Sequence, residues 1–279
     1  MKIPLGTLIR CADITAERLE FYQRIGLSVL QLAGIGEEYL MGDEKSRAKS
    51  EALLALCEKY SLRVPCMFLS YPGQDWSHPS ETVGLTPEAY RAERMILSCR
   101  QIRWAEQYGM KYVSCHVGFF PEKGTESYAR LVREMRQLVM FAEACGLQFL
   151  LETGMETAND LQTFFKDLAP ACAGINFDPA NLLIYDRDDP ETFLDLLQDR
   201  VRIVHCKDAV RPQTGSACGK ETVLGAGQTK IIDLLNRLRN ENFDGYWIIE
   251  RELPPGEEQE RDIAQAVELI KSIEYGECK

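Results

Sequence analysis

Four side chains that can bind a divalent metal stand at the C-terminal ends of four apolar runs in the second half of the chain. The runs read LQFLLE, AGINFD, RIVH and YWIIE, and they end in Glu152, Asp178, His205 and Glu250. Each run has the length and composition of a fully buried strand. Burying a carboxylate or an imidazole without a partner costs several kcal/mol. Four polar ends at equivalent positions therefore predict one shared site.

Three carboxylates and one imidazole form a suitable ligand set for Mn²⁺, Mg²⁺, Co²⁺ or Zn²⁺. Such a set leaves coordination positions open for two substrate oxygens. A metal held by adjacent hydroxyl and carbonyl oxygens acidifies the C–H between them and stabilises the enediolate that follows. Glu152 and Glu250 would lie close to that carbon, so one can remove the proton and the other return it. For Asp178, which precedes Pro179, a helix cap is the alternative interpretation.

Further candidates lie near these ligands in the sequence. His116 ends another strand-like run, and we expect it to contact or polarise a substrate hydroxyl; the alternative is a core histidine bonded to backbone. Lys207 shares the strand face of His205, so it could hold a substrate oxygen or phosphate, or form a salt bridge with a ligating carboxylate. Arg211, in the loop that follows, could reach a substrate hydroxyl or remain solvated. Trp76 could form a wall of the pocket.

The elements that position these residues alternate between strand-like and helix-like along the whole chain. Besides the four runs, strands are expected over residues 3–9, 27–32, 64–70 and 112–117, with amphipathic segments between them. Pro87 and Pro190 mark helix starts. Helix ends are expected at glycines just before strands, namely Gly26, Gly109, Gly146 and Gly245.

Eight strand–helix units in 279 residues give about 35 residues per unit, as in a TIM barrel. A doubly wound open sheet would alternate in the same way. However, only a closed barrel gathers the ends of all its strands around one cleft, and the predicted ligands follow four successive strands. We therefore predict an α/β protein consisting of a single (β/α)8 TIM-barrel domain over residues 1–279, because no linker or change in composition divides the chain.

Composition restricts the function further. The formal net charge of −11 argues against non-specific binding to nucleic acid or to an anionic membrane. Ten cysteines occur singly with no CxxC pair, which indicates reduced thiols and a cytoplasmic protein. The N-terminus lacks the features of a signal peptide, and no apolar stretch is long enough to span a membrane.

Several motifs together resemble those of the xylose isomerase-like TIM-barrel family, which includes sugar isomerases, ketose 3-epimerases and inosose dehydratases. The motifs are LET at 151–153, NFDPANL at 176–182, VHCKD at 204–208, LGAG at 224–227 and FDGYWIIE at 243–250, and they span most of residues 111–252. The resemblance implies metal binding by Glu152, Asp178, His205 and Glu250, with the two glutamates as the proton-transferring pair.

The same resemblance implies substrate-binding positions. Arg211 matches the substrate-binding arginine of the epimerases. Asn181 stands where those epimerases usually have a histidine, so a different substrate pose is expected around it. The His-Cys-Lys-Asp run is closer to the isomerase and dehydratase branches, in which a lysine such as Lys207 is common.

We therefore predict a metal-dependent isomerase or epimerase of a sugar, sugar phosphate or polyol, working through an enediolate and, as in relatives, as a homodimer or homotetramer. An inosose-type dehydratase, which expels a β-hydroxyl after the same proton removal, is the alternative. An abasic-site endonuclease is disfavoured by three histidines and the negative net charge. A barrel that binds a sugar without turnover would keep the same ligands.

Overall fold

The computed structural model describes residues 3–274, and eight parallel strands within them form a closed barrel in the order β1-β10-β7-β6-β5-β4-β3-β2. The predicted (β/α)8 architecture is confirmed. The barrel strands are β1 (Leu5–Arg10), β2 (Val29–Ala33), β3 (Arg63–Phe68), β4 (Tyr112–His116), β5 (Gln148–Glu152), β6 (Gly174–Phe177), β7 (Val201–Cys206) and β10 (Tyr246–Ile249).

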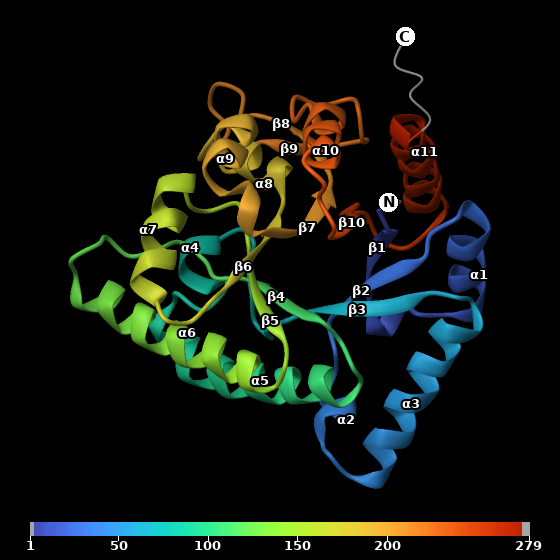
Figure 1. The fold of residues 1–279 in the computed structure, drawn as a ribbon, viewed down its shortest axis with the longest axis horizontal. Coiled ribbons are helices and arrows are strands. Elements are labelled where there is room, and N and C mark those ends of the chain that lie inside the picture. Colours follow the sequence, from blue (N-terminus) through green and yellow to red (C-terminus); the bar gives the residue numbers. More distant parts are fainter. Residues whose placement is uncertain (1–2, 275–279) are drawn as a thin grey trace.

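One long helix follows each barrel strand, so that the helices surround the barrel (Figure 1). These helices are α1 (Ala16–Ile25), α3 (Glu44–Lys59), α5 (Glu88–Gln107), α6 (Glu126–Ala144), α7 (Ala158–Leu168), α9 (Pro190–Leu197), α10 (Ile231–Asn240) and α11 (Glu257–Glu274). Short helices lie in the loops at α2 (Glu37–Leu40), α4 (Pro79–Thr82) and α8 (Pro179–Ile184), with 3-10 turns at η1 (Cys11–Asp13) and η2 (Gln198–Arg200). None of the helices within residues 3–274 is long and apolar enough to cross a membrane.

The predicted helix boundaries hold with two exceptions. Pro190 is the first residue of α9, and Gly26 ends α1 with a φ of +93°. Pro87 is instead the N-cap of α5, which begins one residue later. Gly245 ends no helix, because α10 stops at Asn240. A Cβ at Gly245 would lie 2.0 Å from the carbonyl oxygen of Arg202, so this glycine permits β10 to approach β7.

The barrel interior changes from apolar to polar along the strands. One layer is formed by the buried cluster Val29, Cys66, Tyr112, Leu150, Ile203 and Ile248. Because alternate strand residues face the same side, the next inward positions lie two residues further towards the C-terminal ends. On five of these six strands those positions hold polar residues: Gln31, Ser114, Glu152, His205 and Glu250. The strand register thus builds a polar mouth above an apolar floor.

A separate antiparallel pair, β8 (Asp208–Val210) and β9 (Lys220–Thr222), extends from the end of β7. The carboxylate of Asp208 accepts backbone hydrogen bonds from Ala209, Gly225, Gly227 and Thr229 at 2.9–3.0 Å. This glycine-rich turn is a phosphate site in some barrels. Here the backbone N–H groups of Gly225 and Gly227 are already bound by a carboxylate, which leaves them no capacity for phosphate.

Candidate metal centre

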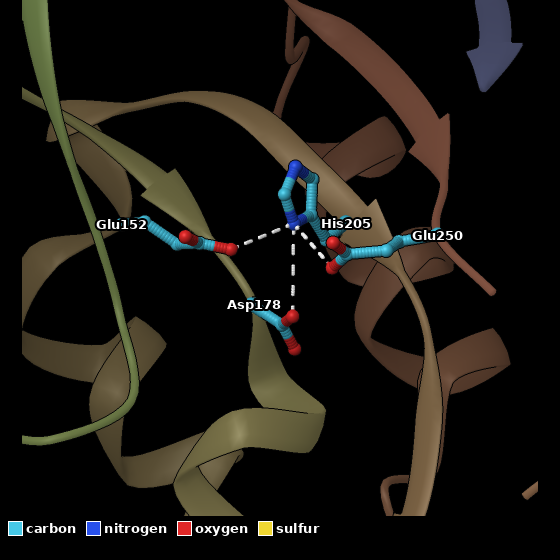
Figure 2. Close-up of side chains that lie close together, drawn as sticks. All are labelled: Glu152, Asp178, His205 and Glu250. Carbon is cyan, nitrogen blue, oxygen red and sulfur yellow. Dashed lines mark ion pairs between the residues drawn. The ribbon is translucent and has the colours of Figure 1, made fainter. Parts of the chain in front are cut away.

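Glu152, Asp178, His205 and Glu250 point towards one another from β5, β7 and the ends of β6 and β10 (Figure 2). One ligand atom from each lies within 4.8 Å of the others. The strand register explains part of this convergence. Glu152 pairs with Asn176, two residues before Asp178, and His205 pairs with Ile248, two residues before Glu250. The four residues singled out in the sequence therefore share one place at the C-terminal mouth of the barrel.

The distances fit a bound divalent cation. Nδ1 of His205 lies 3.0 Å from Oε1 of Glu152, 3.0 Å from Oε2 of Glu250 and 3.6 Å from Oδ2 of Asp178. Ligands at about 2.1 Å from an octahedral ion lie about 3 Å apart at right angles. Within the described residues, His205 Nδ1 is buried without a hydrogen-bond partner. Asp178 Oδ2 and Glu152 Oε2 are buried beside Lys207 Nζ at 3.3 Å and His116 Nε2 at 2.8 Å, respectively. Buried polar atoms normally have partners, so this donor set suits a metal ion.

Asp178 caps a helix and also faces the cluster, so the helix-cap interpretation is confirmed, and its binding of a metal stays a prediction. Its Oδ1 accepts a hydrogen bond of 3.0 Å from the backbone N–H of Asn181 and so caps α8, where Pro179 is the first residue. Its Oδ2 faces the cluster. Burial raises the pKa of Asp178, although the nearby Lys207 opposes that shift.

The two glutamates are held ionised by neighbouring cations. Burial alone would raise the pKa of Glu250, but Lys207 and His205 bring it well below its ordinary value. Burial also opposes ionisation of Glu152, and the charge and hydrogen bond of His116 outweigh it, so the pKa of Glu152 is lowered. Ionised carboxylates are what both a metal and a general base require.

His116 and Trp76 form one side of the site. His116 Nε2 lies 2.8 Å from Oε2 of Glu152, and the two residues pair directly in the register of β4 and β5. The Trp76 ring packs edge-on against the His116 ring with centroids 5.2 Å apart, while remaining 49% exposed. His116 therefore contacts a predicted ligand directly, and its contact with substrate stays a prediction.

Lys207 is almost completely buried among carboxylates. Its Nζ lies 3.3 Å from Asp178 Oδ2, 3.3 Å from Glu250 Oε2 and 2.6 Å from Glu252 Oε1. Asn181 Oδ1 accepts a further hydrogen bond of 3.1 Å. The salt bridge foreseen as the alternative for Lys207 is present, and it places an ammonium group beside two of the four ligands.

Arg211 makes its contacts away from the cluster. Its guanidinium pairs with Asp186 at 2.6 Å and donates to the Asp188 carbonyl at 2.9 Å, and its side chain is 38% exposed. The predicted contact between Arg211 and substrate would require these bonds to open. Arg251 points away from the ligands, as pleat alternation predicts, and pairs with Glu221 and Asp262.

Sequence reasoning missed the partners of the ligands. Gln31 and Asn176 contact the far nitrogen of His205, and Glu252 contacts Lys207. The signal available for Gln31 and Asn176 was a single amide inside an otherwise apolar strand. Glu252, two residues beyond Glu250, resembles an ordinary surface carboxylate in the sequence.

Comparison with known proteins decides the family. The model of the xylose isomerase-like TIM barrel matches residues 19–273. The chain belongs to this family. A crystal structure of a xylose isomerase domain protein from Planctomyces limnophilus is 29% identical and covers 99% of both chains, with a TM-score of 0.91. That of a 3-keto-D-glucoside 4-epimerase from E. coli is 15% identical, covers 97% of this chain and 100% of its own, and has a TM-score of 0.71.

A curated relative, an inosose dehydratase of Lacticaseibacillus casei, is 24% identical over 151 residues, which are 48% of this chain and 50% of the relative. The chain thus spans about half the length of the curated relatives it matches. The more remote structure, at 15% identity, shows a shared fold.

Proposed function

We propose that this protein is a divalent-metal-dependent isomerase or epimerase of a sugar or polyol that works by proton transfer through an enediolate. The observation that carries the proposal is the convergence of Glu152, Asp178, His205 and Glu250, with their ligand atoms within 4.8 Å of one another. Membership of the xylose isomerase-like family supports it.

In this proposal the four residues would hold one ion, for which Mn²⁺, Mg²⁺, Co²⁺ and Zn²⁺ are all candidates. The bound ion would supply Lewis-acid polarisation of substrate oxygens. Glu152 and Glu250 approach the centre from opposite sides, and ionised carboxylates there can remove and return a proton at the carbon beside a carbonyl. Lys207 and Asn181 place hydrogen-bonding groups next to the ligands, where substrate oxygens would lie.

A dehydratase is the second candidate, favoured by the similarity to inosose dehydratase. It would use the same proton removal and then release a hydroxide from the neighbouring carbon. A cytoplasmic location, a homodimer or homotetramer, and a small sugar as the binding partner remain predictions.

The test is incubation of the protein in D₂O with Mn²⁺ and separate ketoses and keto-inositols, followed by NMR. An isomerase or epimerase incorporates one deuterium at the reacting carbon and yields a product of unchanged formula, whereas a dehydratase yields a product lacking one water. Chelation and the Glu250→Gln variant should both abolish exchange. Absence of exchange with every substrate in the panel, despite a bound metal, would contradict the proposal.

A further inference from the structure

A cavity of about 330 Å³ is lined mainly by the loops that follow β4 and β5, the two strands that end in His116 and Glu152. Its lining includes the aromatic side chains of Phe119, Phe120 and Tyr128, together with Glu156 and Thr163, and none of the four predicted metal ligands. A volume just above 300 Å³, walled by rings and a few polar groups, is typical of small-molecule sites.

The aromatic walls of this cavity are held in place by their neighbours. Phe120 packs on Phe164 of α7 with ring centroids 4.4 Å apart, and Tyr128 meets the same ring at 6.2 Å. Phe119 packs edge-on against Tyr185 at 6.3 Å. The cavity therefore has a preformed apolar side on which a sugar ring could pack.

Glu156 is the polar group that the rest of the molecule leaves unexplained. It is 4% exposed, and its Oε2 accepts one hydrogen bond of 3.1 Å from the backbone N–H of Met155. Its Oε1 is buried and has no hydrogen-bond partner within the described residues. Burial raises the pKa of Glu156 to about 8, so at neutral pH it is a carboxylic acid that can both donate and accept.

The charges around the cavity indicate the class of ligand. Glu122 and Asp160 line it beside Glu156. Of its two basic residues, Lys123 is already bound by Asp167 at 2.8 Å, which leaves Arg187. A phosphate group carries a charge near −2 at neutral pH, and here it would face carboxyl groups on several sides. A neutral, hydroxyl-bearing ligand avoids that repulsion.

We propose that this cavity is a second subsite that binds a neutral polyhydroxyl group, a sugar ring or polyol, through a hydrogen bond to Glu156 and packing on Phe119 and Phe120. On the basis of the proposed function, we assign this subsite to the part of the substrate that is remote from the reacting carbon. The substrate is then an unphosphorylated sugar derivative that extends beyond the metal centre.

The test measures binding without turnover, by NMR titration of metal-depleted protein with methyl β-D-glucoside and with D-glucose 6-phosphate. We expect saturable binding of the glucoside and weaker binding of the phosphate. Loss of one hydrogen bond should weaken glucoside binding about tenfold in Glu156→Leu, and Glu156→Gln should restore most of it. Arg103→Gln, at an exposed ion pair outside this cavity, and Glu250→Gln, at the metal centre, should bind the glucoside as the unmodified protein does.

Thr163→Trp, which fills the cavity without altering Glu156, should abolish binding and so tests the site if Glu156→Leu does not fold. The proposal is overturned if the unmodified protein binds no glucoside, if Glu156→Leu or Thr163→Trp binds it normally, or if the phosphate binds more tightly. Because the titration needs neither metal nor turnover, glucoside binding without any isomerase activity would reject the proposed function and leave this subsite standing.

Discussion

The amide oxygen of Gln31 lies 2.7 Å from Nε2 of His205, although the two residues are 174 positions apart in the chain. Both side chains are completely buried. Because Gln31 Oε1 can only accept a hydrogen bond, this contact requires a proton on Nε2, which then cannot accept a hydrogen bond from Asn176 Nδ2 at 3.0 Å. When the ring gives up its other proton, the lone pair is therefore on Nδ1, which faces the three carboxylates, so β2 favours the tautomer in which His205 can bind a metal.

Gln31→Leu should therefore weaken metal binding about 10- to 100-fold, the usual effect of losing the outer partner of a metal-binding histidine. The loss of the acceptor frees the ring to rotate or to take the other tautomer. Calorimetric titration of the chelator-treated protein with Mn²⁺ measures the change.

Gln101→Leu is the matched control for this variant. Gln101 is equally buried, but it bonds to the backbone of Ser70 away from the ligands. It should lower stability without changing metal affinity. Equal metal affinity in Gln31→Leu and the unmodified protein would show that Gln31 does not orient His205.

Asp178→Asn should separate the two uses of Asp178. Asparagine caps helices about as well as aspartate, so α8 should keep its cap, and any loss of stability without metal reflects the missing carboxylate beside Lys207. In the unmodified protein, free metal at 100 times its dissociation constant should add about 2.7 kcal/mol to the free energy of unfolding. Asp178→Asn should lose most of this gain.

Urea denaturation with and without Mn²⁺ measures the gain for Asp178→Asn and for a control, Asp189→Asn. Asp189 caps α9 through its side chain and is exposed. The control should retain the full metal-dependent stabilisation. A full gain in Asp178→Asn as well would remove Asp178 from the ligand set.

Lys207→Met should destabilise the metal-depleted protein by about 3–5 kcal/mol, because removing one partner of a buried ion pair leaves charge uncompensated. Asp178 and Glu250 would lose the ammonium group at 3.3 Å from each. A metal ion supplies replacement positive charge, so saturating Mn²⁺ should recover much of the loss. Thermal unfolding with and without metal measures both effects.

The control is Lys230→Met, which removes an exposed ion pair with Glu191. Exposed pairs contribute at most about 1 kcal/mol, and no metal-dependent recovery is expected there. If Lys207→Met loses as much stability with Mn²⁺ as without it, Lys207 and the metal do not interact with the same carboxylates.

The sequence predicts the barrel and the positions of the four clustered residues because both depend on local pattern. A buried strand ends in a polar residue, and closure of the barrel brings such ends together. The partners of these residues could not be predicted in the same way. Gln31 contacts His205 only through the register of the closed barrel, and nothing in the run around Gln31 indicates which strand it faces.

The contacts of Arg211 and Glu156 depend on loops, for which the sequence pattern gives no geometry. Arg211 can be placed six residues beyond His205 in the sequence, but its pairing with Asp186 follows from the path of the loop after α8. Glu156 was not distinguished from its neighbours, because its burial depends on the path of the loop between β5 and α7.

Glu156 should also make the stability of the protein depend on pH. Its folded-state pKa of about 8 lies above the ordinary glutamate value of 4.5, so the folded state binds a proton that the unfolded state has released. Between these two pH values the free energy of unfolding therefore falls as pH rises. A shift of this size corresponds to a loss on the order of 4 kcal/mol at pH 8.

Glu156→Gln cannot ionise and should lack this loss, so its stability relative to the unmodified protein should increase steadily from about pH 5 to pH 8. Urea denaturation at intervals across that range measures the difference. Glu122→Gln, at an exposed carboxylate of the same cavity, should follow the unmodified protein throughout. Parallel curves for Glu156→Gln and the unmodified protein would show that Glu156 is ionised in the folded state at neutral pH, and that it cannot then donate a hydrogen bond to a ligand.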